Sequence, residues 1–159
     1  KNCGLKFFEQ PIPSKDLDFM NIITTKSSVP ICSDEGVHSK KDIDDIINNR
    51  TSNGVSLKTI KLGGIVDVLN CAIFANENNI SVNLAGKVAE TSISSYAIAN
   101  IATSIPQMKW DLSITNQYLV EDPVLEPLNI KDGKVHIKET IGLGTEIDMS
   151  KAKKYIIQN

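Results

Sequence analysis

Five polar side chains recur along the chain at nearly equal spacing, each at or near the end of a short apolar segment. Asp34 follows Glu9 after 25 residues, and Lys58 follows after 24 more. Asn83 and Asp111 continue the series after a further 25 and 28 residues. Hard cations prefer oxygen ligands, and a lysine confined beside a cation can accept a proton. Two carboxylates followed by a lysine could therefore hold a divalent cation and move a proton next to it.

The elements that would position these side chains alternate between strand-like and helix-like segments. We expect strands at 5–9, 29–34, 54–58, 80–84 and 107–112. Helical periodicity covers 15–25, 39–49, 65–79 and 92–104. Strands that alternate with helices of this length predict right-handed βαβ units and a parallel sheet.

A polar residue at the carboxyl end of every successive strand is what the active site of a (β/α) barrel requires. An open doubly wound sheet is the alternative fold, but it binds its ligand at one switch point and needs no polar group on each strand. A full barrel takes roughly 250 residues, whereas this chain has 159. Five strands alone would leave both sheet edges open. We therefore expect the C-terminal portion of a larger barrel, completed by an upstream segment or a second chain.

The composition excludes several classes of partner. The net charge of −2 gives no broad electrostatic footprint for nucleic acid or for an anionic membrane. No apolar run approaches the length of a membrane span, and the first residues show no signal peptide. Cys3, Cys32 and Cys71 are odd in number and far apart, which favours free thiols and a reducing cytoplasm over a disulfide framework. We expect a cytoplasmic homo-oligomer that acts on a small molecule.

The chain changes character after residue 117. Residues 118–159 contain a Lys-Asp-Gly-Lys turn between two short alternating runs, which predicts a hairpin. An amphipathic pattern at 148–156 predicts a terminal helix. We therefore divide the chain into a partial barrel at 1–117 and a tail at 118–159 that packs on the barrel or on a second domain.

Strand alternation separates the two lysines of "SLKTIKLGGI". Val55 and Leu57 would point towards the covering helices, which leaves Ser56 and Lys58 facing the inside of the barrel. Lys61 falls beyond the strand, before a Gly-Gly turn, where it would be solvated or structural. Burial and a nearby cation would lower the pKa of Lys58 and let it act as a base near neutral pH.

Glu9 and Asp34 allow two interpretations from the residues alone. They could be ligands of Mg²⁺, with a third carboxylate supplied by the missing part of the barrel. They could instead cap the helices that follow the strands. Glu35, directly after Asp34, would support that residue or be solvated.

Three segments together carry a resemblance to a known family: "FFEQP", "PICSDEGV" and "SLKTIKLGGI". They resemble the enolase superfamily and, within it, the muconate lactonizing enzyme subgroup. The resemblance implies strands 4–8 of a (β/α)7β barrel and a tail that packs on an absent N-terminal capping domain. It also implies Mg²⁺ bound by Glu9 and Asp34, with Lys58 as the base that removes the proton alpha to a carboxylate and gives an enediolate.

The resemblance leaves the overall reaction open between a racemase or epimerase of amino acid derivatives and a cycloisomerase or lyase. Dipeptide epimerases of this subgroup carry Asp-x-Asp on strand eight, whereas this chain has Asp111 and Ser113, which favours acylamino acids or other carboxylates. Lys87 and Glu90 lie in the loop after strand seven, where they would contact substrate or be solvated. The family's Lys-x-Lys on strand two and its first metal-binding Asp have no counterpart here. The chain alone should be inactive, and a non-catalytic half-barrel is the third hypothesis.

Overall fold

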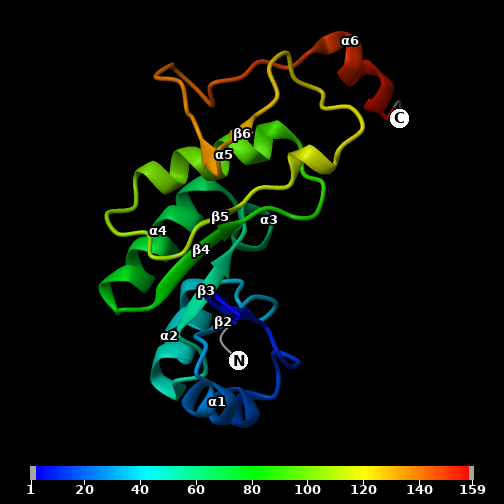
Figure 1. The fold of residues 1–159 in the computed structure, drawn as a ribbon. Helices are drawn as coiled ribbons and strands as arrows, with labels where there is room; N and C mark the ends of the chain where they lie inside the picture. Colours follow the sequence, from blue (N-terminus) through cyan, green and yellow to red (C-terminus); the bar gives the residue numbers. More distant parts are fainter. Residues whose placement is uncertain (1–2, 158–159) are drawn as a thin grey trace.

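The computed structural model describes residues 3–157, and its main feature is a curled sheet of five parallel strands (Figure 1). The strands are β1 (Phe8–Glu9), β2 (Ile31–Ser33), β3 (Gly54–Leu57), β4 (Ser81–Ala85) and β5 (Leu112–Ser113). Their order in the sheet is their order in the chain. This order, together with the curl, is that of the C-terminal part of a (β/α) barrel, as the sequence predicts.

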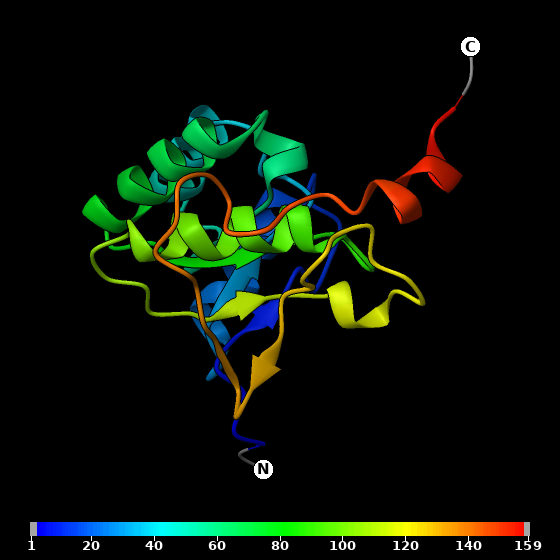
Figure 2. The same cartoon turned by 90° about the horizontal axis from the view of Figure 1, so that it is seen from above.

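Helices fill the connections between the strands and cover one side of the sheet (Figure 2). They are α1 (Leu17–Lys26), α2 (Lys40–Asn49), α3 (Thr59–Leu62), α4 (Ile65–Glu77) and α5 (Ser92–Thr103). The helix α4 packs on β3 and β4, and α5 packs on β4 and β5. Among the described residues, no helix has both the length and the apolar composition needed to cross a membrane.

The two faces of β3 differ in the way that strand alternation predicts. Val55 and Leu57 are completely buried and belong to the apolar cluster formed with the covering helices. Ser56 points to the other face, where its Oγ lies 3.3 Å from Oδ1 of Asn83 on the neighbouring strand. Apolar packing therefore fixes which side chains of β3 face the inside of the barrel.

Aromatic side chains fill the inside of the curl near the start of the strands. The rings of Phe7 and Trp110 stack with a centroid distance of 4.4 Å. Trp110 also lies over Gly54, where a side chain would collide with its ring. Next to this stack, Lys6 and Asp111 form an exposed ion pair. The two outer edges of the described sheet are thus brought together across the inside of the half-barrel.

The fifth strand differs from its prediction. It was expected at 107–112, but β5 is Leu112–Ser113, so Asp111 lies before the strand and not near its end. Nδ2 of Asn83 donates a hydrogen bond to the backbone carbonyl of Asp111. The pairing of β4 with β5 begins only at Leu84↔Leu112. A side-chain hydrogen bond stands here in place of backbone pairing between the two strands. The periodicity of the sequence does not reveal such a bond.

A short 3₁₀ turn, Asn116–Tyr118, spans the expected boundary between the partial barrel and the tail. The predicted hairpin is present as β6 (Ile130–Lys131) and β7 (Lys134–Val135), which pair antiparallel. The terminal helix is shorter than expected, because α6 covers only Met149–Ala152 and continues as a 3₁₀ turn at Lys153–Tyr155. Figure 1 shows the tail in yellow to red beside α5.

One buried serine joins the tail to the barrel. Ser92, at the start of α5, donates from Oγ to Oδ2 of Asp122 at 2.6 Å and from its backbone N to the same oxygen at 3.0 Å. The same Oγ accepts from Nδ2 of Asn116 at 3.1 Å and from N of Leu128 at 2.7 Å. The carboxylate of Asp122 also lies where the helix dipole favours a negative charge. Ser92 thus connects a helix of the barrel with two segments of the tail.

Replacing Ser92 with alanine should lower the free energy of unfolding by about 2–3 kcal/mol, because it leaves buried partners unsatisfied. Chemical denaturation of the intact protein measures this change. Ser104, exposed just after the same helix, is the matched control, and Ser104→Ala should stay within about 0.5 kcal/mol of wild type. Equal effects of the two substitutions would contradict the role given to Ser92.

Candidate active site at the carboxyl ends of the strands

Asp34 is the centre of the candidate site. It follows β2 directly and is 8% exposed. Each carboxylate oxygen receives one lysine: Nζ of Lys58 lies 2.5 Å from Oδ2, and Nζ of Lys61 lies 2.6 Å from Oδ1. The structure therefore brings together Asp34 and both lysines of "SLKTIKLGGI".

The two lysines are held differently. Lys61 donates to Oδ1 of Asp34, to the backbone carbonyl of Asp34 at 2.6 Å and to the carbonyl of Ser56 at 3.0 Å. These three bonds use all three donors of its ammonium group. Within residues 3–157, the ammonium of Lys58 has Asp34 as its one hydrogen-bond partner. Lys58 thus keeps donors available at the mouth of the barrel, whereas Lys61 is locked in place.

The position of Lys61 corrects one part of the sequence interpretation. The lysine was expected in a turn beyond the strand, but it lies on α3 with its side chain only 13% exposed. Lys58 is the N-cap of α3, and its carbonyl accepts a hydrogen bond from the backbone N of Lys61 at 3.1 Å. This first turn of the helix brings the Lys61 side chain back to Asp34, the residue that Lys58 also contacts. Its ammonium group contacts Asp34 and Ser56, which agrees with the structural interpretation of Lys61 more than with the solvated one.

The environment shifts the pKa of two members of this cluster. Burial alone would raise the pKa of Asp34, but the hydrogen bonds from Lys58 and Lys61 outweigh it and hold the pKa below its ordinary value. Burial lowers the pKa of Lys61, although its bond to Asp34 acts in the opposite direction. Asp34 is therefore ionised in neutral solution, as a metal ligand has to be.

Glu9 lies on β1. Its charge and those of Lys58 and Lys61 act in opposite directions on the pKa of the Cys32 thiol. Burial raises the pKa of Cys32, and the carboxylates of Glu9 and Asp34 raise it further because both lie close to the sulfur. Glu9 is exposed and its strand position pairs with Cys32, two residues before Asp34, so the two carboxylates come from neighbouring strands. Oxygen ligands of this kind suit Mg²⁺. Residues 3–157 contain no cluster of three or more His, Cys, Asp or Glu able to hold a metal. The chemistry of Glu9 and Asp34 would allow them to supply two oxygen ligands of a divalent cation.

The strand register explains why Glu9, Asp34 and Lys58 all lie at the carboxyl ends of their strands. Glu9 pairs with Cys32, which lies two positions before Asp34. Ser33 pairs with Val55, which places Asp34 level with Ser56, again two positions before Lys58. From each strand to the next, the candidate residue is shifted by two positions towards the carboxyl end. Such a shift in register is the stagger of a barrel.

Two further residues predicted to bind substrate lie at β5. Asp111 pairs with Lys6 and is exposed. Ser113 faces inward, where Nδ2 of Asn83 donates to its Oγ at 3.3 Å. Asn83 also bonds to Ser56, so it connects β3, β4 and β5 below the mouth. The structure therefore places Ser113 in the same polar layer as Asn83, whereas Asp111 lies before β5 beside Lys6 and outside that layer.

The remaining predicted residues lie around the mouth. Lys87 and Glu90 are in the loop after β4, and this loop is tied to Thr115, whose Oγ1 donates to the carbonyl of Lys87 at 2.5 Å. The carboxylate of Glu90 accepts from the Ser94 hydroxyl on α5, which orients it towards the helix. Glu35 is exposed beside Asp34. Neither Lys87 nor Glu35 joins the cluster of Asp34 and the two lysines.

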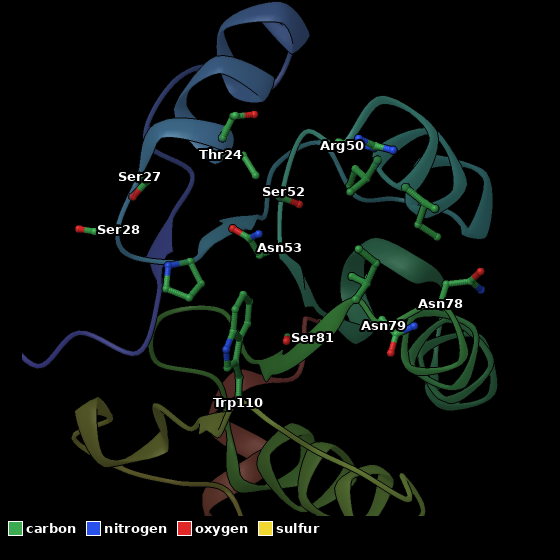
Figure 3. A pocket seen from close by; sticks show the side chains of 15 residues that line it. Thr24, Ser27, Ser28, Arg50, Ser52, Asn53, Asn78, Asn79, Ser81 and Trp110 are labelled. Carbon is green, nitrogen blue, oxygen red and sulfur yellow. The ribbon is translucent and has the colours of Figure 1, made fainter.

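A separate hollow of about 680 Å³ lies at the opposite end of the strands (Figure 3). Figure 3 shows Trp110 at its edge, with Asn53, Ser52 and Arg50 on its walls. Barrel enzymes place their chemistry at the carboxyl ends of the strands, where Asp34 and Lys58 lie. The hollow therefore lies at the other end of the strands from the cluster of Asp34, Lys58 and Lys61.

Parallel βα units with charged residues at their carboxyl ends define the C-terminal half of a (β/α) barrel with an enzyme-like mouth. The sequence profile of the family described as "Enolase C-terminal domain-like" matches residues 1–151. The chain belongs to this family, as the three sequence segments indicated.

Individual relatives agree with this assignment. Chloromuconate cycloisomerase CbnB of Cupriavidus necator is 25% identical over 156 residues, which cover 98% of this chain and 42% of that protein. The o-succinylbenzoate synthase of Listeria innocua is 26% identical over 151 residues, which cover 95% of this chain and 40% of that protein. This chain thus spans about 42% of the length of the first of these relatives.

Solved structures share the fold over nearly all of the chain. Muconate lactonizing enzyme from Pseudomonas putida superposes with a TM-score of 0.89 at 27% identity, covering 96% of this chain and 42% of that one. The N-succinyl Arg/Lys racemase from Bacillus cereus superposes with a TM-score of 0.86 at 25% identity, covering 94% and 40%. The half-barrel is therefore a shared part of enzymes that are named for different reactions.

Proposed function

We propose that this chain supplies the base and two metal ligands of a (β/α) barrel that removes the proton alpha to a substrate carboxylate. The observation that carries the proposal is the 2.5 Å contact between Nζ of Lys58 and Oδ2 of Asp34 at the carboxyl ends of the strands. Membership of the enolase-like family supports it. Because the chain spans only part of its relatives, the activity belongs to the assembled barrel, meaning this chain together with the strands that complete it.

The two outer strands indicate where those missing strands would dock. β1 and β5 each have a neighbour on one side only within the described sheet. Phe8 on β1 is 52% exposed, and an upstream segment or a second chain that pairs there would cover it. In the tail, Val120, Ile141 and Ile157 expose apolar side chains to the surroundings. We propose that the tail packs on a capping domain through such side chains.

The chemistry of each residue follows from its contacts. Glu9 and Asp34 would hold Mg²⁺, and a bound divalent ion supplies positive charge that stabilises negative charge developing on the substrate carboxylate. Lys58, in its neutral form, accepts the alpha proton on Nζ, and the electron pair left on carbon moves into the carboxylate to give an enediolate. Lys61 stays in its three hydrogen bonds and keeps Asp34 in position.

Racemisation or epimerisation of an amino acid derivative is the first candidate for the overall reaction. Return of the proton to the opposite face of the enediolate would invert the alpha carbon. Ser113, in place of a second carboxylate after Asp111, leaves less negative charge for a free substrate ammonium group. The likeness to the N-succinyl Arg/Lys racemase supports an acylated substrate.

Cycloisomerisation is the second candidate, and the names of the relatives favour it. Chloromuconate and muconate cycloisomerases are among the similar proteins. In the ring-opening direction, the enediolate formed by proton removal would break the bond to an internal carboxylate. In the ring-closing direction, attack of that carboxylate would form the enediolate, which then takes up a proton. Lys58 would serve both reactions, so the base does not distinguish them.

Proton exchange in D₂O tests the shared step. The assembled barrel with Mg²⁺ should exchange the alpha proton of a member of a panel of N-succinyl amino acids, dipeptides and muconolactone, as followed by NMR. Exchange with inversion identifies a racemase, and ring opening or closure identifies a cycloisomerase. Failure to exchange any member of a broader panel of carboxylates would contradict the proposal.

A further inference from the structure

Gln10, the residue after Glu9, connects the ends of β1 and β2 through its side chain. Its Oε1 accepts a hydrogen bond from the backbone N of Asp34 at 2.8 Å. Its Nε2 donates to the carbonyl of Ile12, also at 2.8 Å. The backbone N of Gln10 donates to the carbonyl of Cys32 at 2.8 Å. One residue thus contacts the backbone of β2 at Cys32 and the backbone N of Asp34 just after that strand, while it is bonded covalently to Glu9.

The backbone of Gln10 is in an unusual conformation for this purpose. Its φ is 38°, in the left-handed region that a residue other than glycine rarely occupies. Such a conformation is unfavourable by itself and persists where the surroundings enforce it. Here this conformation turns the chain sharply after β1. The side-chain amide of Gln10 then reaches the backbone N of Asp34 at the end of β2. Strain of this kind is frequent at functional sites.

We propose that Gln10 is a positioning residue that sets the separation of the Glu9 and Asp34 carboxylates and thereby the affinity of the site for Mg²⁺; this inference rests on the proposed function. Gln10 holds the backbone N of Asp34, and Lys61 holds the carbonyl and Oδ1 of the same residue. Asp34 is therefore fixed from both sides. Mg²⁺ demands near-ideal octahedral geometry at short distances, so a small displacement of one ligand lowers its affinity.

The Gln10→Met variant tests the proposal, because methionine keeps the length of the side chain and removes both amide bonds. Calorimetric titration of the EDTA-treated assembled barrel with Mg²⁺, without substrate, should show affinity weakened by about 10-fold or more, as for other groups that support metal ligands. Gln117→Met is the matched control. Nε2 of Gln117 donates to the carbonyl of Ile114 at 3.1 Å, in the 3₁₀ turn just before the tail. Its Mg²⁺ affinity should stay within about twofold of wild type.

Gln10→Glu supplies the rescue, because glutamate keeps the oxygen that accepts from the backbone N of Asp34. Its Mg²⁺ affinity should be at least that of wild type, also at raised salt, where the added charge is screened. Wild-type affinity in Gln10→Met, or equal loss in Gln10→Met and Gln117→Met, would overturn the positioning role alone. Absence of Mg²⁺ binding by the wild-type protein would overturn the proposed function and the positioning role with it.

Discussion

Replacing Lys58 with alanine should reduce alpha-proton exchange by the assembled barrel by about a thousandfold, within the range that a general base contributes. The affinity for Mg²⁺ and the fold should remain, because Lys58 contributes one hydrogen bond to Asp34 while Lys61 retains its own three. The expected result is a protein that binds metal but no longer moves the proton.

Lys61→Ala should give the opposite pattern. It removes three hydrogen bonds, two of them to Asp34, and leaves the carbonyl of Ser56 without this partner. We expect a loss of about 2 kcal/mol in the free energy of unfolding and weaker Mg²⁺ binding, since hydrogen bonds to a charged group are worth about 1.5–3 kcal/mol. Exchange should fall less than in Lys58→Ala when Mg²⁺ is saturating.

Three measurements on each variant separate the two roles: exchange in D₂O by NMR, Mg²⁺ titration by calorimetry, and chemical denaturation. Lys41→Ala is the control, because Lys41 pairs with Asp45 on the surface of α2 and should change none of the three. Exchange that survives in Lys58→Ala but disappears in Lys61→Ala would mean that Lys61, and not Lys58, is the base.

The contrast between these lysines also shows how far sequence reasoning reaches. Alternation along β3 correctly sends Lys58 inward, because a strand has a period of two and one side is packed with apolar residues. The period changes immediately after Lys58, where α3 begins, so strand parity no longer applies to Lys61. The three-residue spacing is a helical signal, but a four-residue helix is too short to be recognised by its periodicity.

The fold is more predictable than the site for a physical reason. The order of the strands follows from repeated βα units, since right-handed crossovers place each strand next to the preceding one. The role of Gln10 follows from a single positive φ and two side-chain bonds. Similarly, the short β5 follows from the bond between Asn83 and the carbonyl of Asp111. Contacts between residues distant in the chain leave no pattern in one sequence.

A substitution at Gly54 should have the largest effect on stability. A Cβ placed on Gly54 would lie 2.2 Å from Cζ3 of Trp110 and 2.6 Å from the backbone oxygen of Ser81. The Trp110 ring cannot withdraw freely because it stacks on Phe7, and Ser81 pairs with Gly54 in the sheet. We expect Gly54→Ala to lower the free energy of unfolding by about 3 kcal/mol, at the upper end of the usual cost of overpacking.

A double-mutant cycle with Trp110→Leu identifies which contact is responsible. Leucine lacks the six-membered ring whose atoms approach Gly54 most closely, so part of the cost of Gly54→Ala should disappear in the double variant. We expect a coupling of about 1 kcal/mol or more, as for residues in direct contact, measured by chemical denaturation of the assembled barrel. Strictly additive effects would mean that the backbone of β4, and not Trp110, is what requires glycine at this position.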